Sequence, residues 1–257
     1  MTPKTLLYET VPASGALLYL EDVTVLFDGF KALDIERFEL QDKELRVIIG
    51  PNGAGKTTLC DVVSGKTRLT TGRVYFDKTE ITSMTEESIA KLGIGRKFQI
   101  PTVFDGLTVY ENMELALPRH QSLFGALFKN RTAEDRDRIF SFLERVRLAD
   151  SSELLAKNLS HGQRQWLEIS MLIVSEPKLL LVDEPAAGLT DEETMRTAEI
   201  LLELRGQRSI IVIEHDMDFV RQLDAPVTVL SEGKIMSEGS MEEVQSDPRV
   251  IEAYIGR

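Results

Sequence analysis

Short apolar runs, each followed by a segment of helical periodicity, recur through the second half of the chain and near residue 45. The runs are apolar at nearly every position, which is typical of strands buried on both faces of a parallel sheet. Their alternation with helical segments predicts an α/β fold. The four expected strands are 45–49, 178–183, 209–214 and 227–231.

The first third of the chain shows a different pattern, in which apolar and polar residues partly alternate. Alternation over 16–27 and 35–41, with a further candidate at 72–77, predicts a small antiparallel sheet beside the parallel one. Farther on, Ser83 with Glu86 and Thr108 with Glu111 are capping-box patterns, which mark the starts of two helices. We expect the first of these helices to be short and to end near residue 92.

The stretch from about residue 101 to 158 has helical character. Its most regular helical face runs from about 133 to 147, where apolar residues recur at three- and four-residue spacing. We therefore expect a helical subdomain inserted into the α/β core. The predicted organisation is one domain over 17–257, preceded by an N-terminal extension at 1–16.

Composition narrows the classes of function. The chain has 257 residues, a formal net charge of −12 and a single cysteine, Cys60. The negative charge disfavours nucleic acid or anionic lipid as a direct partner. The alternative interpretation is that this charge only keeps the chain soluble. No apolar run approaches the ~18 residues of a membrane span, and the first residues lack a signal-peptide pattern. We expect a cytoplasmic protein that reaches a membrane only through a protein partner.

The first candidate site is the turn after the strand Leu45–Ile49. It fits the pattern G-x-x-x-x-G-K-[ST], in which a glycine-rich loop presents backbone N–H groups to phosphate oxygens. Lys56 is expected to reach the β- and γ-phosphates and to act in catalysis by neutralising charge, and the Thr57 hydroxyl to bind Mg2+. The nine residues predicted to bind ATP are Gly50, Pro51, Asn52, Gly53, Ala54, Gly55, Lys56, Thr57 and Thr58.

Two carboxylates form the second candidate site, at the end of the apolar strand 178–183. An acidic residue in the position of Asp183, beside a phosphate loop, can hold Mg2+ through water. Glu184 follows directly, where a carboxylate can polarise a water aligned with the γ-phosphate. We therefore expect Asp183 to be a metal ligand and Glu184 to be catalytic.

Residues 159–163 read Leu-Ser-His-Gly-Gln. This segment resembles the signature of ABC transporter ATP-binding subunits, which is typically Leu-Ser-Gly-Gly-Gln. The two candidate sites above are similar to other motifs of the same family. The resemblance covers about residues 17 to 256 and implies a P-loop NTPase of the ABC ATPase type, with an antiparallel β subdomain and an inserted helical subdomain. In that family the signature binds the γ-phosphate held by the opposite subunit. Ser160, Gly162 and Gln163 are therefore expected to contact ATP across a dimer interface.

The same resemblance implies further roles. Gln99 matches the family's glutamine loop, which senses Mg2+ and the attacking water, and is expected to be both catalytic and metal-binding. His215 matches the catalytic switch histidine that contacts the γ-phosphate. Phe27 is expected to stack on adenine, with Phe30 as the alternative, and the loop 187–190 is expected to cross the dimer interface.

The chain departs from the family pattern at two positions. His161 replaces the first glycine of the signature, where it either adds a donor near the phosphate or has no role. Thr190 replaces the usual aspartate of the interface loop, which places the aspartate-mediated contact in doubt. With Glu193, Thr190 instead forms a capping box for the next helix.

The pieces 159–169 and 183–194 resemble ATPases of the branched-chain amino acid and amide importer group, and within it an ATPase of bacterial urea importers. The expected function is ATP hydrolysis that powers import of a small polar solute, with urea as the first choice. The alternatives are a branched-chain amino acid importer and a lipid or lipopolysaccharide exporter. The implied partners are a second, non-identical ATPase subunit (a homodimer being the alternative in isolation), two transmembrane permease subunits on the inner face of the membrane and, indirectly, a solute-binding protein.

Overall fold

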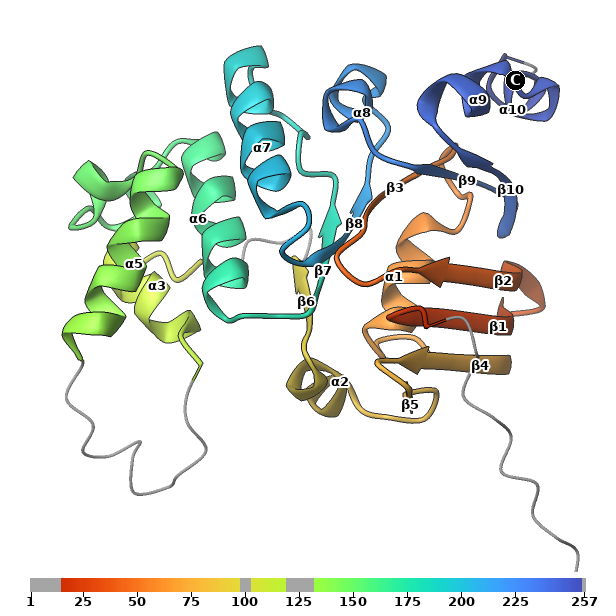
Figure 1. Ribbon diagram of the computed structural model, residues 1–257, viewed down its shortest axis with the longest axis horizontal. Coiled ribbons are helices and arrows are strands. Elements are labelled where there is room, and N and C mark those ends of the chain that lie inside the picture. The colour runs from red at the N-terminus through yellow and green to blue at the C-terminus, as the bar shows by residue number, and fades with distance from the viewer. Residues whose placement is uncertain (1–14, 98–102, 119–131, 256–257) are drawn as a thin grey trace, which may run out of the picture.

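The strands form two sheets in the computed structural model, which describes residues 15–97, 103–118 and 132–255 (Figure 1). One sheet has six strands in the order β10-β9-β3-β8-β7-β6, and the other is antiparallel with the order β2-β1-β4-β5. Neighbours from β9 to β6 pair in parallel, whereas β10 pairs antiparallel with β9. The strands are β1 Leu18–Phe27, β2 Phe30–Leu40, β3 Leu45–Ile49, β4 Thr71–Phe76, β5 Thr79–Glu80, β6 Ile94–Lys97, β7 Leu179–Asp183, β8 Ser209–Ile213, β9 Val227–Ser231 and β10 Lys234–Gly239.

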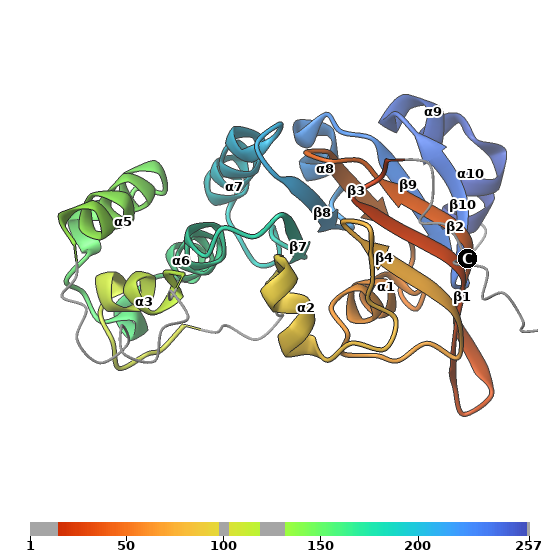
Figure 2. The same ribbon diagram turned by 60° about the horizontal axis from the view of Figure 1, so that its bottom comes forward.

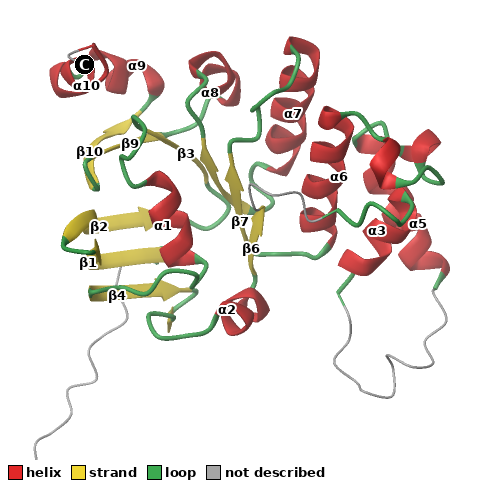
Figure 3. Cartoon of the chain, turned by 180° about the vertical axis from the view of Figure 1, so that it is seen from behind, coloured by secondary structure: helices red, strands yellow, loops and turns green. Residues whose placement is uncertain are grey.

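Helices lie on both sides of the six-stranded sheet and at one end of the molecule (Figures 1 and 3). Within the described ranges, no helix is both long enough and apolar enough to cross a bilayer. The helices are α1 Lys56–Val63, α2 Glu86–Leu92, α3 Val109–Ala116, α5 Ala133–Arg145, α6 His161–Val174, α7 Asp191–Leu204, α8 Met217–Leu223, α9 Met241–Ser246 and α10 Pro248–Ile255.

The six-stranded sheet separates two hydrophobic cores. Val47 and Ile49 of β3 belong to the core shared with α6, α7 and α8, whereas Ile48 belongs to the core shared with α1 and the antiparallel sheet. In β7, Leu180 and Leu181 divide in the same way. Successive side chains of a strand point to opposite faces, so both faces of this sheet are covered. This explains why its strands read as continuous apolar runs.

The predicted strands are present, with shifts at their ends. Strand β9 has the predicted bounds, whereas β2 begins at Phe30, five residues before the expected start at residue 35. The expected cap at Ser83 is wrong: the cap of α2 is Thr85, whose hydroxyl accepts from the backbone N–H of Ser88 at 3.3 Å. The helix cannot begin after Ser83, because Thr85 has an extended backbone with a ψ of 153°.

The helices α3 and α5 pack against α6 at the end of the molecule away from the antiparallel sheet (Figure 2). The capping box of α3 has the predicted form: Thr108 and Glu111 exchange hydrogen bonds of 2.8 and 3.1 Å. In α5, Ile139 and Leu143 are buried in the shared core, as the helical spacing predicts. The division into one domain over 17–257 with a helical subdomain near 101–158 stays a prediction.

Candidate functional site

Three neighbouring strands bring together three of the predicted catalytic residues, Lys56, Glu184 and His215. Strands β3, β8 and β7 lie side by side in parallel, with Ile48 paired to Ile213 and Ile213 paired to Asp183. The carboxyl ends of parallel strands meet at one edge of the sheet, which is where open α/β sheets bind ligands. The phosphate loop follows β3, Glu184 follows β7, and His215 lies two residues beyond β8.

Two glycines of the phosphate loop are required by close packing. A Cβ atom on Gly50 would lie 2.2 Å from the carbonyl oxygen of Leu230, and one on Gly55 would lie 2.7 Å from that of Ala32. Gly55 has a left-handed φ of 102° and begins α1 without a side-chain cap. The first N–H groups of α1 are therefore not used by a capping side chain, as an anion site requires.

Lys56 is the buried cation of this loop, with 8% of its surface exposed. Its ammonium donates to the carbonyl oxygens of Gly50 at 2.7 Å and Pro51 at 3.0 Å. Burial lowers the pKa of Lys56, and the nearby carboxylates of Glu184 and Asp183 oppose that shift. The structure thus places the predicted cation and both predicted carboxylates close enough to interact. Of the other loop residues, those exposed to solvent are Asn52, Gly53 and Thr57, those half-buried are Pro51, Gly55 and Thr58, and those buried are Gly50 and Ala54.

Asp183 is buried, with 4% of its surface exposed, and neither carboxylate oxygen has a hydrogen-bond partner among the described residues. Burial is the main cause that raises its pKa. A buried carboxylate without a partner fits a bound cation. No group of three or more His, Cys, Asp or Glu side chains in the described part of the chain could hold a metal ion. A cation at Asp183 would therefore share oxygen ligands with the phosphate loop and its ligand.

Glu184 and His215 lie next to each other at the edge of the sheet. Nδ1 of His215 is 3.6 Å from Oε1 of Glu184, and the two side chains are 61% and 37% exposed. Glu184 has a left-handed φ of 47°, and its N–H donates to the carbonyl oxygen of Ile213 at 2.9 Å. Nine other described non-glycine residues also have a positive φ, so it is the contact with His215, and not this conformation, that distinguishes Glu184.

The signature segment forms the start of α6. Ser160 and Gln163 make a capping box: the Ser160 hydroxyl accepts from Gln163 N–H at 3.2 Å, and the Gln163 side chain accepts from Ser160 N–H at 3.0 Å. A Cβ atom on Gly162 would lie 2.2 Å from Oε1 of Glu193. Gly162 therefore lets the start of α7 approach the start of α6.

The two departures from the family pattern lie on segments that touch. Nε2 of His161 is 3.2 Å from the carbonyl oxygen of Ala187, a contact that the sequence did not predict. Thr190 and Glu193 form the predicted capping box, in which Glu193 N–H donates to the Thr190 hydroxyl at 3.3 Å. The signature and the loop 187–190 thus form one packed surface.

The signature is not brought to the chain's own phosphate loop. Leu59 and Val62 of α1 belong to one core, whereas Leu167 and Ile169 of α6 belong to the other. The two helices therefore lie on opposite faces of the six-stranded sheet (Figures 1 and 3). The expected contact of the signature with ATP can therefore come only from another chain.

The two aromatic candidates face each other at the tip of a hairpin. Phe27 ends β1 and Phe30 begins β2, and the two residues pair across the strands. Their exposed fractions are 49% and 67%, so both rings are accessible. The predicted glutamine, Gln99, lies outside the described residues.

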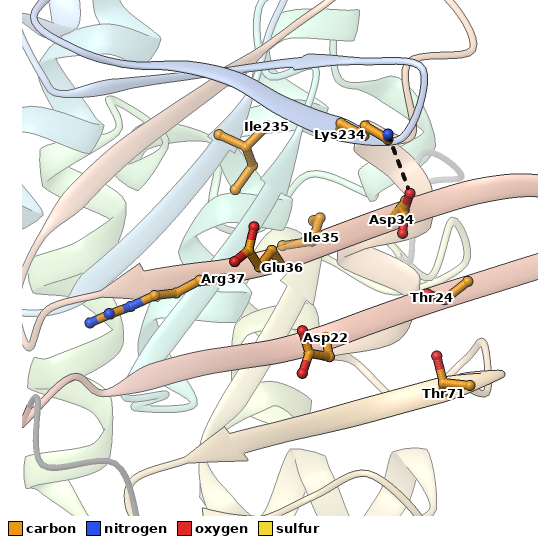
Figure 4. A pocket seen from close by; sticks show the side chains of 9 residues that line it. All are labelled: Asp22, Thr24, Asp34, Ile35, Glu36, Arg37, Thr71, Lys234 and Ile235. Atoms are coloured by element: carbon orange, nitrogen blue, oxygen red, sulfur yellow. Dashed lines mark ion pairs between the residues drawn. The ribbon is translucent and has the colours of Figure 1, made fainter.

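A separate pocket of about 610 Å³ lies between the antiparallel sheet and β10 (Figure 4). Its lining shares no residue with the sites above. Asp34 in this pocket pairs with Lys31 at 3.0 Å and with Lys234 at 3.6 Å. This pocket does not belong to the candidate site.

Sequence reasoning missed Glu214, the residue between β8 and His215. It is 1% exposed, and its carboxylate accepts from the backbone N–H of Ala186. The available signal was a charged residue placed between an apolar run and a predicted catalytic histidine.

Comparison with known proteins gives two family matches. The ABC transporter family matches residues 33–187, and the branched-chain amino acid ATP-binding cassette transporter family matches residues 234–257. The chain is 34% identical over 254 residues, 95% of this chain and 99% of the relative, to the high-affinity branched-chain amino acid transport ATP-binding protein LivG of Escherichia coli K12. It is 32% identical over 252 residues, 95% of this chain and 99% of the relative, to BraF of Pseudomonas aeruginosa, whose name describes the same role.

Solved structures give the same result for the fold. A nucleotide-free ATP-binding cassette from an ABC transporter matches with a TM-score of 0.81 at 32% identity, covering 94% of this chain and 100% of that chain. An ATP-binding cassette in its ADP conformation matches with a TM-score of 0.80 at 34% identity, covering 94% and 99%. The predicted fold class is therefore confirmed.

Proposed function

This chain belongs to the ATP-binding subunits of ABC transporters, of the branched-chain amino acid importer type, and we propose that it powers the import of branched-chain amino acids. It is an ATPase coupled to transport. The observation that carries the ATPase part of the proposal is the meeting of Lys56, Asp183, Glu184 and His215 at the ends of three adjacent strands. The proposed cargo is supported by the relatives.

Branched-chain amino acids replace urea as the preferred cargo. The relatives reported above are named for branched-chain amino acid transport, and the match over residues 234–257 is to that group. The expectation of urea came from the pieces 159–169 and 183–194. These pieces surround the nucleotide site, and an ATPase of this kind does not touch the cargo, so they are weak indicators of it.

The proposed active unit contains two ATPase chains that close head to tail around two ATP molecules. Each nucleotide lies between the phosphate loop of one chain and Ser160, Gly162 and Gln163 of the other. The placement of α1 and α6 on opposite faces of the sheet supports this arrangement. Each ATP then contacts both chains, so ATP favours the closed dimer and hydrolysis removes the link.

In the proposed mechanism Glu184 polarises the attacking water, and His215 beside it contacts the γ-phosphate. Lys56 leaves the carbonyl oxygens of its own loop and neutralises charge on the phosphates. Thr57 and Asp183 would hold Mg2+, which would supply further positive charge at the phosphates. Gln99 is proposed to complete the γ-phosphate shell, and Phe27 to stack on adenine.

The proposed partners follow from this unit. They are a second ATPase chain, non-identical in the cell, two transmembrane permease subunits and, indirectly, a solute-binding protein. The chain would lie on the cytoplasmic face of the membrane and be held there by the permeases.

Reconstitution tests the function directly. The chain is co-purified with its permease subunits, placed in vesicles with the solute-binding protein, and assayed for ATP hydrolysis with leucine or urea. We expect leucine to stimulate hydrolysis and urea to have no effect. Stimulation by urea alone would overturn the proposed cargo, and failure to co-purify with any permease would overturn the proposed assembly.

A further inference from the structure

Glu214 is a buried carboxylate that accepts three hydrogen bonds from backbone N–H groups, and its Oε2 lies 3.8 Å from Nδ1 of the His215 ring. Its Oε1 accepts from the N–H of Ala186 at 2.8 Å, and its Oε2 accepts from the N–H groups of His215 at 2.9 Å and Asp216 at 3.2 Å. Only 1% of the residue is exposed. Burial of a carboxylate is unfavourable unless hydrogen bonds compensate it, and here three do.

The three donors belong to two segments that carry proposed catalytic groups. Ala186 lies two residues after Glu184, and His215 is the proposed switch residue. Directly before the loop that contains Ala186, the N–H of Glu184 donates to the carbonyl oxygen of Ile213. The backbone around Glu184 is therefore bonded to the end of β8 at two points.

A second buried side chain holds the same loop from α6. Gln165 is 6% exposed, and its amide nitrogen donates to the carbonyl oxygen of Pro185. Pro185 and Ala186 are thus each fixed by a different element. The loop after Glu184 cannot shift relative to His215 without breaking a buried hydrogen bond.

We propose that Glu214 is a positioning residue for ATP hydrolysis, which fixes the backbone of His215 and the loop after Glu184 as one unit. It acts through these two residues and does not touch the nucleotide. The inference rests on the proposed roles of Glu184 and His215. No neutral residue can replace it: an apolar side chain leaves three N–H groups without an acceptor, and glutamine offers one acceptor oxygen and points an NH2 group at an N–H donor.

Histidine NMR of the nucleotide-free full chain tests the positioning itself. The chain has three histidines, so ring signals can be assigned with single variants such as His215→Asn. In Glu214→Gln we expect the ring signal of His215 to broaden, because a loosened backbone moves on the microsecond-to-millisecond timescale, whereas loss of a charge 3.8 Å from Nδ1 by itself only shifts the signal. The matched control is Glu238→Gln, whose carboxylate accepts from Arg46 and Thr228 near the start of β3, and which should leave the His215 signal unchanged.

Steady-state kinetics of the assembled transporter supply the second measurement. Loss of one charge-assisted buried bond predicts that kcat of Glu214→Gln falls by about tenfold or more, while the Kd for ATP changes less than about twofold. A His215 signal that does not broaden, or an unchanged kcat, would overturn the inference. Full turnover in both Glu184→Gln and His215→Ala would instead refute the proposed function and leave the NMR result standing.

If Glu214→Gln does not fold, hydrogen exchange of the unmodified chain tests the three hydrogen bonds to Glu214. The amides of Ala186, His215 and Asp216 donate to a buried carboxylate, so we expect them to exchange far more slowly than exposed loop amides. Exchange of all three at the rate of exposed loop amides would contradict the inference.

Discussion

Nε2 of His161 and the carbonyl oxygen of Ala187 lie 3.2 Å apart, which joins the start of α6 to the loop after Glu184. The ring also approaches Gly188, where an added Cβ atom would be 3.4 Å from Nε2. The glycine that is usual at this position of the signature has no side chain to make this contact. His161 therefore connects the start of α6 to the loop 187–190, and both segments are expected to face the second subunit.

Replacement of His161 by glycine should remove the contact with Ala187 and leave the fold intact. One net hydrogen bond is worth about 1 kcal/mol, so we expect the amides of 186–190 to exchange with solvent about fivefold faster. Mass-spectrometric hydrogen exchange measures this, with the peptide covering β9 as internal control. Equal exchange of 186–190 in both proteins would show that the contact adds no stability.

Glu184→Gln should bind ATP normally and lose turnover. The amide keeps the size of the side chain but cannot act as a base, and a general base contributes about 100-fold or more. The checks are ATP hydrolysis by phosphate release and ATP binding by fluorescence. Size-exclusion chromatography with ATP should show an accumulated dimer. Hydrolysis at the normal rate would remove Glu184 from the catalytic role.

Lys56→Ala should weaken nucleotide binding itself. The variant loses the only loop side chain that can bring positive charge to the phosphates, and a charge-assisted bond is worth enough to raise the Kd about tenfold or more. The matched control is Lys91→Ala, since Lys91 is an exposed lysine on α2 paired with Glu87. Titration calorimetry distinguishes them, and equal affinities in both variants would contradict the assignment.

Asp183→Asn should raise the thermal stability of the metal-free protein at neutral pH. Burial raises the pKa of Asp183 above 3.8, so the protonated form favours folding. That favourable contribution is present below the unfolded-state pKa and is lost as pH rises through the folded-state pKa. We expect Tm to rise by roughly 2–4 °C at pH 7, with the gain shrinking toward pH 4, while Mg2+-dependent hydrolysis is lost. A lower Tm at pH 7 would show that the carboxylate is compensated.

Phe27→Ala and Phe30→Ala distinguish the two aromatic candidates. Stacking on a base is worth about 1–3 kcal/mol, so loss of the stacking ring should raise the Kd for ATP by about fivefold to 100-fold. We expect that effect in Phe27→Ala and little change in Phe30→Ala. The reverse order would transfer the role to Phe30, and no effect in either would place adenine elsewhere.

Much of the sheet could be predicted because its strands are buried on both faces. Ile210, Ile211 and Val212 read as one apolar run since alternate members enter different cores. Strand β10 was missed because it is an edge strand: Ile235 and Met236 are only half-buried, and charged residues surround them. Buried and exposed residues therefore do not alternate along β10, and its sequence lacks the period-two pattern that predicts a strand.

In the candidate site, too, only features with a local sequence pattern could be predicted. The glycine loop and the Asp-Glu pair are local patterns, so Lys56, Asp183 and Glu184 were predictable from neighbouring residues. The contact of His161 with Ala187 and the bonds of Glu214 join segments 26 and 28 residues apart in the chain. Such contacts depend on how α6, β7 and β8 pack, and a single sequence does not encode them in any local pattern.

The separation of α1 from α6 by the six-stranded sheet has a kinetic consequence. No rotation of a loop can carry Ser160 around the sheet to the same chain's Lys56, so we expect an isolated copy to stay idle at any ATP concentration. In dilute solution the total rate of ATP consumption should then grow with the square of the protein concentration. Copies that meet no second ATPase chain would then add nothing to the cell's energy expenditure.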